Sequence, residues 1–407
     1  MRGGPRPGTG DPVHLNPNLA ATAVPPVPEA RRWGAAYDGR AGPLLNVSQA
    51  APVDPPTAAL RAEIARVAME DPGAHLYGPV LGLPDLRAEV AARWRDAYAG
   101  EVAAEDVAIT SGCNQAFATA VATLAAPGDE VILPVPWYFN HAMWLAQSGV
   151  RAVPLPCGPD MVPDANAAER LIGPRTRAVA LVTPNNPTGA EYPAATLGAF
   201  FDLCAARGLA LIVDETYRDF DSREGAPHDL FTRDWRGVLI QLYSFSKAYR
   251  LTGHRVGAMV ADPARLAEAE KVLDTVTICP AQIGQRAALW GMRHLGGWLG
   301  GERREILDRG AAIREALGTL AGWRPITAGA YFAYAAHPWD GPSDAVARAL
   351  AAEWGVLALP GTMFRPEGDD GALRIAFANL DREGIGALRG RLGAAAAGPL
   401  AGLPLRG

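Results

Sequence analysis

The sequence predicts an α/β protein, with a mostly parallel, doubly wound sheet in a large domain and a smaller α+β domain after it. Between residues 105 and 260, short apolar stretches alternate with longer stretches of helical periodicity. This alternation is typical of a parallel sheet with helices on both faces. Beyond residue 285 the pattern changes to long helical runs and a few short strands. The length of 407 residues also favours two domains over one core.

Composition and charge exclude several classes of protein. Apolar residues make up 49% of the chain and charged residues 20%, which indicates a globular protein. The 38 basic and 43 acidic residues leave a net charge of −5, which argues against a nucleic-acid partner. The sequence has no apolar run long enough to span a membrane, and Met1–Pro5 does not resemble a signal peptide.

The cysteines indicate the cellular compartment. They lie far apart and lack the spacing of metal ligands: Cys113, Cys157, Cys204 and Cys279. The sequence therefore predicts reduced thiols, no metal site and a cytoplasmic location.

We expect four segments along the chain. Residues 1–56 form an N-terminal arm and part of the small domain, and 57–286 form the large domain. Residues 287–395 form the small C-terminal domain, and 396–407 form a disordered tail. The arm is rich in Pro and Gly, with a short helix expected near Glu29–Tyr37.

The large domain has apolar stretches that predict strands at Val107–Thr110, Glu130–Leu133, Arg151–Leu155, Ala178–Thr183, Leu209–Asp214, Val238–Tyr243 and Gly257–Val260. Helical periodicity is found at Thr57–Met69, Leu83–Tyr98, Asn114–Leu124, His141–Gln147 and Ala194–Arg207. Ligands of such sheets bind at the carboxyl ends of the strands.

The small domain begins with a long helical run over Ala287–Leu317, with a break expected at Gly296–Gly301. Strands are expected at Tyr331–Ala335 and Arg374–Ala378, and helices at Ser343–Glu353 and Arg382–Leu392.

Lys247 carries the clearest chemical signal. It lies just past an apolar strand, in Ser244-Phe245-Ser246-Lys247. A lysine in a partly desolvated pocket is neutral often enough to be nucleophilic and to form a Schiff base. A surface lysine at a strand end is the alternative, so the interpretation depends on the other motifs.

Five further clusters fall in loops or at strand ends. Ser111–Gln115 opens a helix whose amides suit a phosphate. Pro134–Phe139 holds three consecutive aromatic residues, which suit either a flat ring or a core. Pro184–Gly189 has the composition of a turn.

The other two clusters are charged. Asp214 ends an apolar strand, and a buried lone aspartate needs a cationic partner. Arg374 begins a predicted strand, where it is either a carboxylate clamp or a solvated side chain.

Together these motifs resemble the class I/II aminotransferase-like group of pyridoxal 5′-phosphate (PLP) enzymes, which have the aspartate-aminotransferase fold (fold type I). The resemblance covers roughly residues 45 to 380. It lies in Asn-Asn-Pro-Thr-Gly at 185–189, Asp-Glu-Thr-Tyr at 214–217, Ser-Phe-Ser-Lys at 244–247 followed by Arg255, and Arg-Ile-Ala-Phe-Ala at 374–378.

The resemblance implies a role for each catalytic residue. Lys247 would form the internal aldimine with PLP and then move the Cα proton of the substrate. Asp214 would pair with the pyridinium nitrogen, and Tyr217 and Asn186 would hydrogen-bond the phenolic oxygen of the ring. Tyr138 would stack on the ring, with Trp137 beside it as the alternative.

It also implies how phosphate and substrate are held. The phosphate would contact the turn Gly112-Cys113-Asn114 through its amides, the hydroxyls of Ser244 and Ser246, and Arg255. Tyr77 would reach the phosphate of a neighbouring subunit, which implies a homodimer with shared active sites. The substrate contacts implied are Arg374 for the α-carboxylate, and Ala50, Asn186, Trp137, Tyr331, Phe332 and Phe364 around it. Ala50 departs from the glycine found in many relatives.

The implied activity is that of an aminotransferase acting on an α-amino acid and a 2-oxo acid. The alternative keeps the fold and PLP but performs elimination, replacement, cyclisation or C–C bond formation, with an amino acid or S-adenosylmethionine as substrate. The same cofactor ligands serve all of these reactions.

Overall fold

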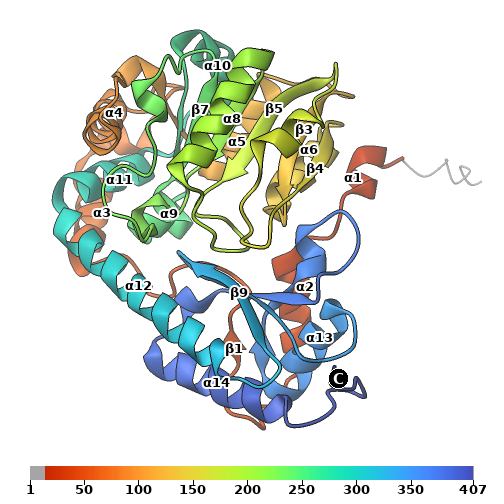
Figure 1. Ribbon diagram of the computed structural model, residues 1–407. Coiled ribbons are helices and arrows are strands. Elements are labelled where there is room, and N and C mark those ends of the chain that lie inside the picture. Colours follow the sequence, from red (N-terminus) through yellow and green to blue (C-terminus); the bar gives the residue numbers. More distant parts are fainter. Residues whose placement is uncertain (1–13, 407) are drawn as a thin grey trace, which may run out of the picture.

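The computed structural model describes residues 14–406, and two sheets organise it. A seven-stranded sheet with its helices forms the upper part of Figure 1, and a four-stranded sheet lies in the lower part. The predicted α/β class is confirmed. Over residues 14–406, no helix is long and apolar enough to cross a membrane.

The large sheet has the strand order β2-β8-β7-β6-β5-β3-β4. Its strands are β2 (Val107–Thr110), β3 (Glu130–Val135), β4 (Arg151–Pro156), β5 (Thr176–Val182), β6 (Ala210–Asp214), β7 (Leu239–Ser244) and β8 (Gly257–Val260). Neighbouring strands are parallel except β8, which is antiparallel to both β2 and β7.

The sheet is buried on both faces because its residues alternate between two hydrophobic cores. In β6, Leu211 and Val213 join one core, and Ala210 and Ile212 join the other. The first core includes helices α4 (Pro84–Tyr98), α8 (Ala194–Arg207) and α11 (Gln282–His294). The second includes α5 (Cys113–Ala122), α6 (Phe139–Gln147) and α10 (Pro263–Thr277).

The second sheet has the order β12-β13-β10-β9 and is antiparallel throughout. Its strands are β9 (Arg324–Gly329), β10 (Phe332–Ala336), β12 (Leu359–Pro360) and β13 (Ala372–Ile375). Its core is shared with α12 (Gly296–Gly318), α13 (Ser343–Trp354) and α14 (Arg382–Ala395).

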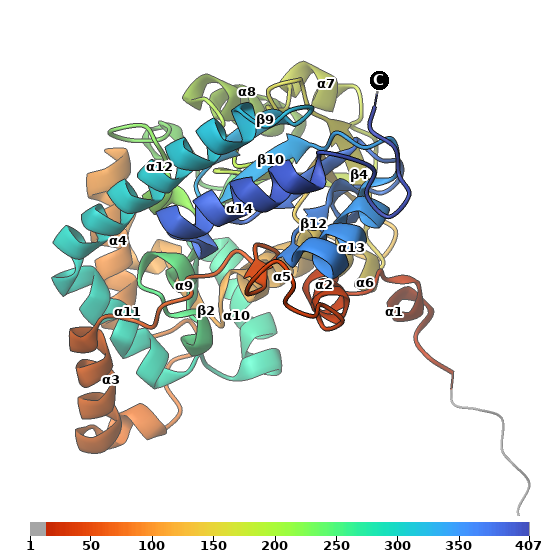
Figure 2. The same ribbon diagram turned by 90° about the horizontal axis from the view of Figure 1, so that it is seen from below.

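The beginning of the described chain joins this second sheet's domain. Strand β1 (Leu45–Asn46) pairs in parallel with β11 (Val356–Leu357). Helix α2 (Pro26–Gly34) lies beside α13 in both views (Figures 1 and 2). The remaining helices are α1 (Pro17–Ala21), α3 (Ala58–Glu70), α7 (Ala165–Glu169) and the short α9 (Phe245–Ala248).

The expectation of a disordered tail at 396–407 is wrong as far as residue 406. The Leu400 side chain is 1% exposed and belongs to the small-domain core. The Asp340 N–H donates to Pro404 O at 2.7 Å, and the Arg406 N–H donates to Pro338 O at 2.8 Å. The tail has few apolar residues among its small ones and so shows little periodicity, although the burial of Leu400 holds the segment against the small-domain core.

Other boundaries differ from those expected. The long helical run breaks at Leu295, before the glycines, and Arg374 lies inside β13 instead of starting a strand. Helix α2 begins at Pro26, because proline is well suited to the first turn of a helix. Residues 1–13 of the expected arm, and Gly407, lie outside the described residues, and the domain boundaries stay predictions.

Candidate active site

Most of the predicted site residues converge at one edge of the large sheet. Asp214 ends β6, Lys247 follows β7, and Asn186 follows β5. Strands that run in one direction bring their carboxyl ends to the same edge, so motifs distant in sequence meet there. A cavity of about 160 Å³ lies at this edge. It is lined by Cys113, Asn114, Tyr138, Val182, Asn186, Asp214, Thr216, Tyr217, Ser244, Ser246, Lys247 and Arg255.

One end of this cavity suits a phosphate group. Helix α5 begins at Cys113, and the first amides of a helix have no partner within the helix and carry partial positive charge. Arg255 lies beside this turn, with Nη1 3.4 Å from Ser246 Oγ and 3.0 Å from Thr252 O. Ser244 caps α9 by accepting the Ser246 N–H at 3.2 Å.

Gly112 allows this close approach. A Cβ atom at Gly112 would lie 2.2 Å from Arg255 Nη2, and the glycine has φ +88°. The positive φ favours glycine here, and a larger residue would displace the Arg255 guanidinium from this position. Burial raises the pKa of the Cys113 thiol well above its usual range, which leaves the backbone amide as this residue's useful group.

Asp214 is buried at the middle of the site, and its partner is His141 on α6. His141 Nε2 lies 3.2 Å from Asp214 Oδ2, at ion-pair distance but without the alignment of a hydrogen bond. The Thr216 N–H donates to Asp214 Oδ1 at 3.0 Å. Burial alone raises the pKa of the Asp214 carboxyl, but His141 and Thr216 outweigh it and hold the pKa below its usual range.

His141 is the functional residue that the sequence reasoning missed. The sequence analysis paired Asp214 with the pyridinium nitrogen of PLP and assigned no role to His141. The His141 ring stacks on Phe117, with centroids 3.7 Å apart. A histidine one helical turn after Tyr138 was the available signal.

Lys247 points its amine at the N-terminal segment. Nζ donates to Ala50 O at 2.8 Å and lies 5.8 Å from the Tyr217 ring centroid. Burial lowers the pKa of Lys247 to about 8, and the charges of Arg255 and Arg374 contribute to this lowering. The chain has only one other lysine, Lys271, which is exposed on α10.

Arg374 is 2% exposed and lies between two aromatic rings. Its guanidinium carbon is 5.2 Å from the Phe332 centroid and 5.0 Å from that of Phe364. Nη1 donates to Asn186 Oδ1 at 2.9 Å, Nη2 donates to Ser48 O, and Nε has no partner.

Among residues 14–406 the partners of Arg374 are the neutral oxygens of Asn186 and Ser48 and no carboxylate, and burial lowers the pKa of its guanidinium to about 10. A buried, uncompensated cation is a strong binding site for an anion.

The aromatic residues divide between cavity and core. Tyr138 and Tyr217 line the cavity, and burial raises the pKa of Tyr138 to about 12. Trp137 packs in the second core and Tyr331 packs behind Tyr217, with centroids 5.3 Å apart. Within the described chain, neither of these two side chains lines the cavity.

Tyr77 lies on the surface, away from this cavity. Its side chain is 80% exposed, beside Leu76 at 66%. A role for Tyr77 within this subunit's site is therefore not supported, whereas a role in a neighbouring subunit stays a prediction.

The cavity continues toward the N-terminal segment as a space of about 420 Å³. Lys247, Arg374, Asn186, Tyr217 and Ala50 line it, together with residues of α2 that the sequence analysis did not assign, among them Arg31.

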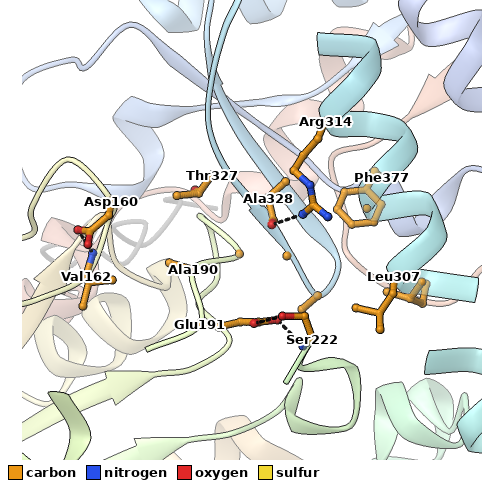
Figure 3. A pocket seen from close by; sticks show the side chains of 15 residues that line it. Asp160, Val162, Ala190, Glu191, Ser222, Leu307, Arg314, Thr327, Ala328 and Phe377 are labelled. Carbon is orange, nitrogen blue, oxygen red and sulfur yellow. Dashed lines mark hydrogen bonds between the residues drawn. The ribbon is translucent and has the colours of Figure 1, made fainter. Parts of the chain in front are cut away.

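A separate cavity of about 390 Å³ lies between α12, β9 and the turn at Gly189–Glu191 (Figure 3). Its polar side chains are already partnered. Arg314 Nη1 donates to Ala328 O at 2.8 Å, and Glu191 accepts from the Ser222 N–H at 2.7 Å. It contains none of the predicted site residues, so the lysine cavity is the candidate active site.

The residues of the lysine cavity fit PLP. An amide and arginine cradle would hold the phosphate, an ionised buried carboxylate would face the ring nitrogen, and a lysine amine of lowered pKa would face the aldehyde. Gly112 supports this fit, because any larger residue would displace Arg255 from the cradle.

Comparison with solved structures defines the class of fold. Aspartate aminotransferase of Thermus thermophilus superposes with a TM-score of 0.86 at 23% identity, covering 94% of this chain and 99% of that chain. This likeness shows the aspartate-aminotransferase fold.

Sequence comparison then identifies the family. Residues 44–392 match the model for aminotransferase class I and II, so the chain belongs to this family and is a transferase. An aromatic aminotransferase of Arabidopsis thaliana is 32% identical over 350 residues, covering 83% of this chain and 86% of that protein. A valine–pyruvate aminotransferase of Mycobacterium tuberculosis is 30% identical over 372 residues, covering 87% and 92%. The predicted aminotransferase class is confirmed.

Proposed function

We propose that this site transfers the amino group of an α-amino acid to a 2-oxo acid, with PLP as cofactor and Lys247 as the group that moves the Cα proton. One observation carries the proposal. Lys247, with a pKa of about 8, and the unpaired cation Arg374 line the same cavity. Bound PLP supplies an electron sink conjugated with the substrate Cα.

The large domain would hold the cofactor. The amides of Cys113 and Asn114, the hydroxyls of Ser244 and Ser246, and Arg255 would bind its phosphate. Asp214, ionised beside His141, would keep a proton on the ring nitrogen. Tyr217 and Asn186 would donate hydrogen bonds to the ring's phenolic oxygen, and Tyr138 would cover one face of the ring.

Arg374 would hold the α-carboxylate of the substrate. Its planar guanidinium forms two parallel hydrogen bonds with a carboxylate, and the rings of Phe332 and Phe364 fix its plane. The carboxylate would also compensate a buried charge that has no acidic partner in the described chain.

Lys247 would accept and return the proton at Cα. With a pKa of about 8, roughly one tenth of the free amine is neutral at pH 7, far more than for an ordinary lysine. Its hydrogen bond to Ala50 O aims the amine at the substrate side of the cavity.

A homodimer is part of this proposal. Five large apolar side chains are exposed around Tyr77 and at the end of α10: Met69, Leu76, Tyr77, Val276 and Ile278. The Gly78 N–H donates to Cys279 Sγ at 3.3 Å, so the two segments are neighbours. An exposed apolar surface of this kind suits a subunit interface, where Tyr77 would reach the partner's phosphate site. A cytoplasmic location stays a prediction.

The test is a single-turnover assay with the PLP-loaded enzyme, an amino-acid panel and no oxo acid. Amino transfer predicts up to one equivalent of 2-oxo acid per site and no free ammonia. Lys247→Ala should abolish this product, whereas Lys271→Ala, which changes the only other lysine, should not. Continuous release of ammonia or of a side-chain fragment would instead indicate elimination or replacement chemistry, and the proposal would be withdrawn.

A further inference from the structure

A buried polar cluster lies directly behind the residues that would contact the PLP ring. It packs on the face of the large sheet that α4 covers, whereas His141 belongs to α6 on the other face. The Glu215 cluster consists of Glu215, Trp94, Tyr98, His228 and Gln241. All five side chains are buried.

One carboxylate oxygen is at the centre of this cluster. The Tyr98 hydroxyl and Gln241 Nε2 each donate to Glu215 Oε2 at 2.7 Å. His228 Nε2 lies 3.3 Å from the same oxygen. Trp94 Nε1 donates to Gln241 Oε1 at 2.9 Å, so the amide of Gln241 is fixed in turn.

We propose that Glu215 is a positioning residue, which holds Asp214 and Tyr217 from behind the sheet in the places where they contact the PLP ring. This inference rests on the proposed function, because it takes the ring contacts of these two residues from there. Within the described chain, no member of the Glu215 cluster lines the lysine cavity or its continuation. The effect of Glu215 on the cofactor therefore passes through the backbone of its neighbours.

The chain that follows β6 alternates between the cavity and the cluster. Asp214 and Tyr217 line the cavity, whereas the Glu215 side chain joins the cluster. Asp219 also turns away from the cavity and accepts from the Tyr243 hydroxyl at 2.7 Å. Successive residues of extended chain point to opposite faces, so fixing Glu215 also fixes the direction of Asp214. Tyr217 is held in the same way, because it lies between two anchored residues.

The same contacts join this segment to the strand that leads to the lysine. Gln241 and Tyr243 both lie on β7, which ends three residues before Lys247. Between their contacts, the Glu215 N–H donates to Leu242 O at 2.9 Å. The ring contacts and the lysine are therefore held in one fixed relation by consecutive residues of β7.

A contribution to stability alone is a poor account of this buried carboxylate. Buried ion pairs often stabilise a fold less than apolar residues of the same size, whereas a satisfied polar network fixes one arrangement of the chain. Burial alone raises the pKa of the Glu215 carboxyl, but His228, Arg218 and Tyr98 outweigh it and hold the pKa below its usual range. The Arg218 guanidinium carbon lies 4.8 Å from the Tyr98 ring centroid.

The test measures how strongly the apoprotein prefers PLP to an analogue in which a CH group replaces the ring nitrogen. Glu215→Leu removes the acceptor, and Glu215→Gln keeps one acceptor oxygen. The matched control is Asp106→Leu, because Asp106 is a buried acid at the amino end of β2 that pairs with Arg236 at 2.7 Å. The free energy of unfolding of each variant is measured beside the two dissociation constants.

We expect Glu215→Leu to bind PLP about 10- to 100-fold more weakly, as for a lost hydrogen bond to a charged group. The analogue has no contact with Asp214 to lose, so the preference for PLP should fall at least about fivefold. Glu215→Gln should restore part of this preference. Asp106→Leu should lose stability but keep the preference within about twofold, because it is remote from the site.

The single-turnover assay gives a second measurement. In Glu215→Leu the limiting rate should fall about 10- to 100-fold, because small displacements of positioned groups are costly. The half-saturating concentration of amino acid should stay within about threefold, since Arg374 is untouched. If Glu215→Leu does not fold, Tyr98→Phe removes one donor and should lower the preference for PLP about two- to fivefold.

Equal losses of affinity for PLP and for the analogue in Glu215→Leu would show a merely structural role and overturn the inference. An unchanged preference in Tyr98→Phe, or a fall in Asp106→Leu as large as that in Glu215→Leu, would overturn it as well. Equal affinity of the wild type for PLP and the analogue would instead refute the proposed role of Asp214, and the inference with it.

Discussion

Replacing Gly112 by alanine is the sharpest test of the phosphate cradle. The new Cβ would lie 2.2 Å from Arg255 Nη2 and 2.9 Å from its Cζ. Ordinary contacts need about 3.5 Å, so the guanidinium must move by about 1 Å or more. The backbone at φ +88°, ψ 165° also disfavours any residue with a Cβ, by about 1–3 kcal/mol.

The expected loss of affinity follows from the displaced arginine. A hydrogen bond to a charged group contributes about 1.5–3 kcal/mol, so Gly112→Ala should bind PLP about 10- to 100-fold more weakly. The assay titrates the apoprotein with PLP and follows absorbance, and a denaturant titration gives the free energy of unfolding.

Gly208→Ala is the matched control. Gly208 has φ +65° at the end of α8, and an added Cβ would meet no atom within 4 Å. This variant should lose about 1 kcal/mol of stability and keep its affinity for PLP. If Gly112→Ala binds PLP as tightly as Gly208→Ala does, then Arg255 does not act in the cradle as inferred.

Three further predictions concern titration and packing. Modification of the apoprotein by an amine reagent, mapped by mass spectrometry, should show a midpoint near pH 8 at Lys247, because burial lowers the pKa of its amine to about 8. The exposed Lys271 is the internal reference. A midpoint near pH 10.5 at Lys247 would contradict the buried site. Burial lowers the pKa of His337 from 6.5 to about 4, so its neutral form favours the folded state above pH 6.5, and this contribution to stability is lost as the pH falls toward 4. His337→Gln should therefore flatten the pH dependence of the free energy of unfolding between pH 4 and 6.5. An unchanged slope would refute this assignment. Leu400→Ala should destabilise the fold by about 2–4 kcal/mol in denaturant titration, whereas a disordered tail would show no loss.

Much of the active site could be predicted from local sequence. Asp214, Lys247 and Asn186 each follow or end an apolar stretch that forms a parallel strand, and parallel strands carry their carboxyl ends to one edge. The expected phosphate turn at Gly112 and the arginine at 255 also meet in the structure. For Asp214 and Lys247 the position at the end of a strand was enough to place the residue, whereas the roles of Asn186 and Arg255 were implied by the family resemblance.

Local patterns misplaced residues whose surroundings come from distant parts of the chain. Trp137 and Tyr331 were expected beside the substrate but pack into cores, because an aromatic residue in a loop satisfies either role. The tail was expected to be disordered, yet Leu400 completes the core of the small domain.

By itself, the sequence determined the order of strands and helices, the edge where ligands bind and the reactive groups placed there, because these depend on periodicity and on residues a few positions apart. Only the tertiary structure decided that His141 faces Asp214, that Ala50 O receives the Lys247 amine and that Arg31 enters the substrate cavity. The physical reason is that these contacts join segments far apart in the chain, so the packing of one segment on another sets them and not the pattern of either segment alone.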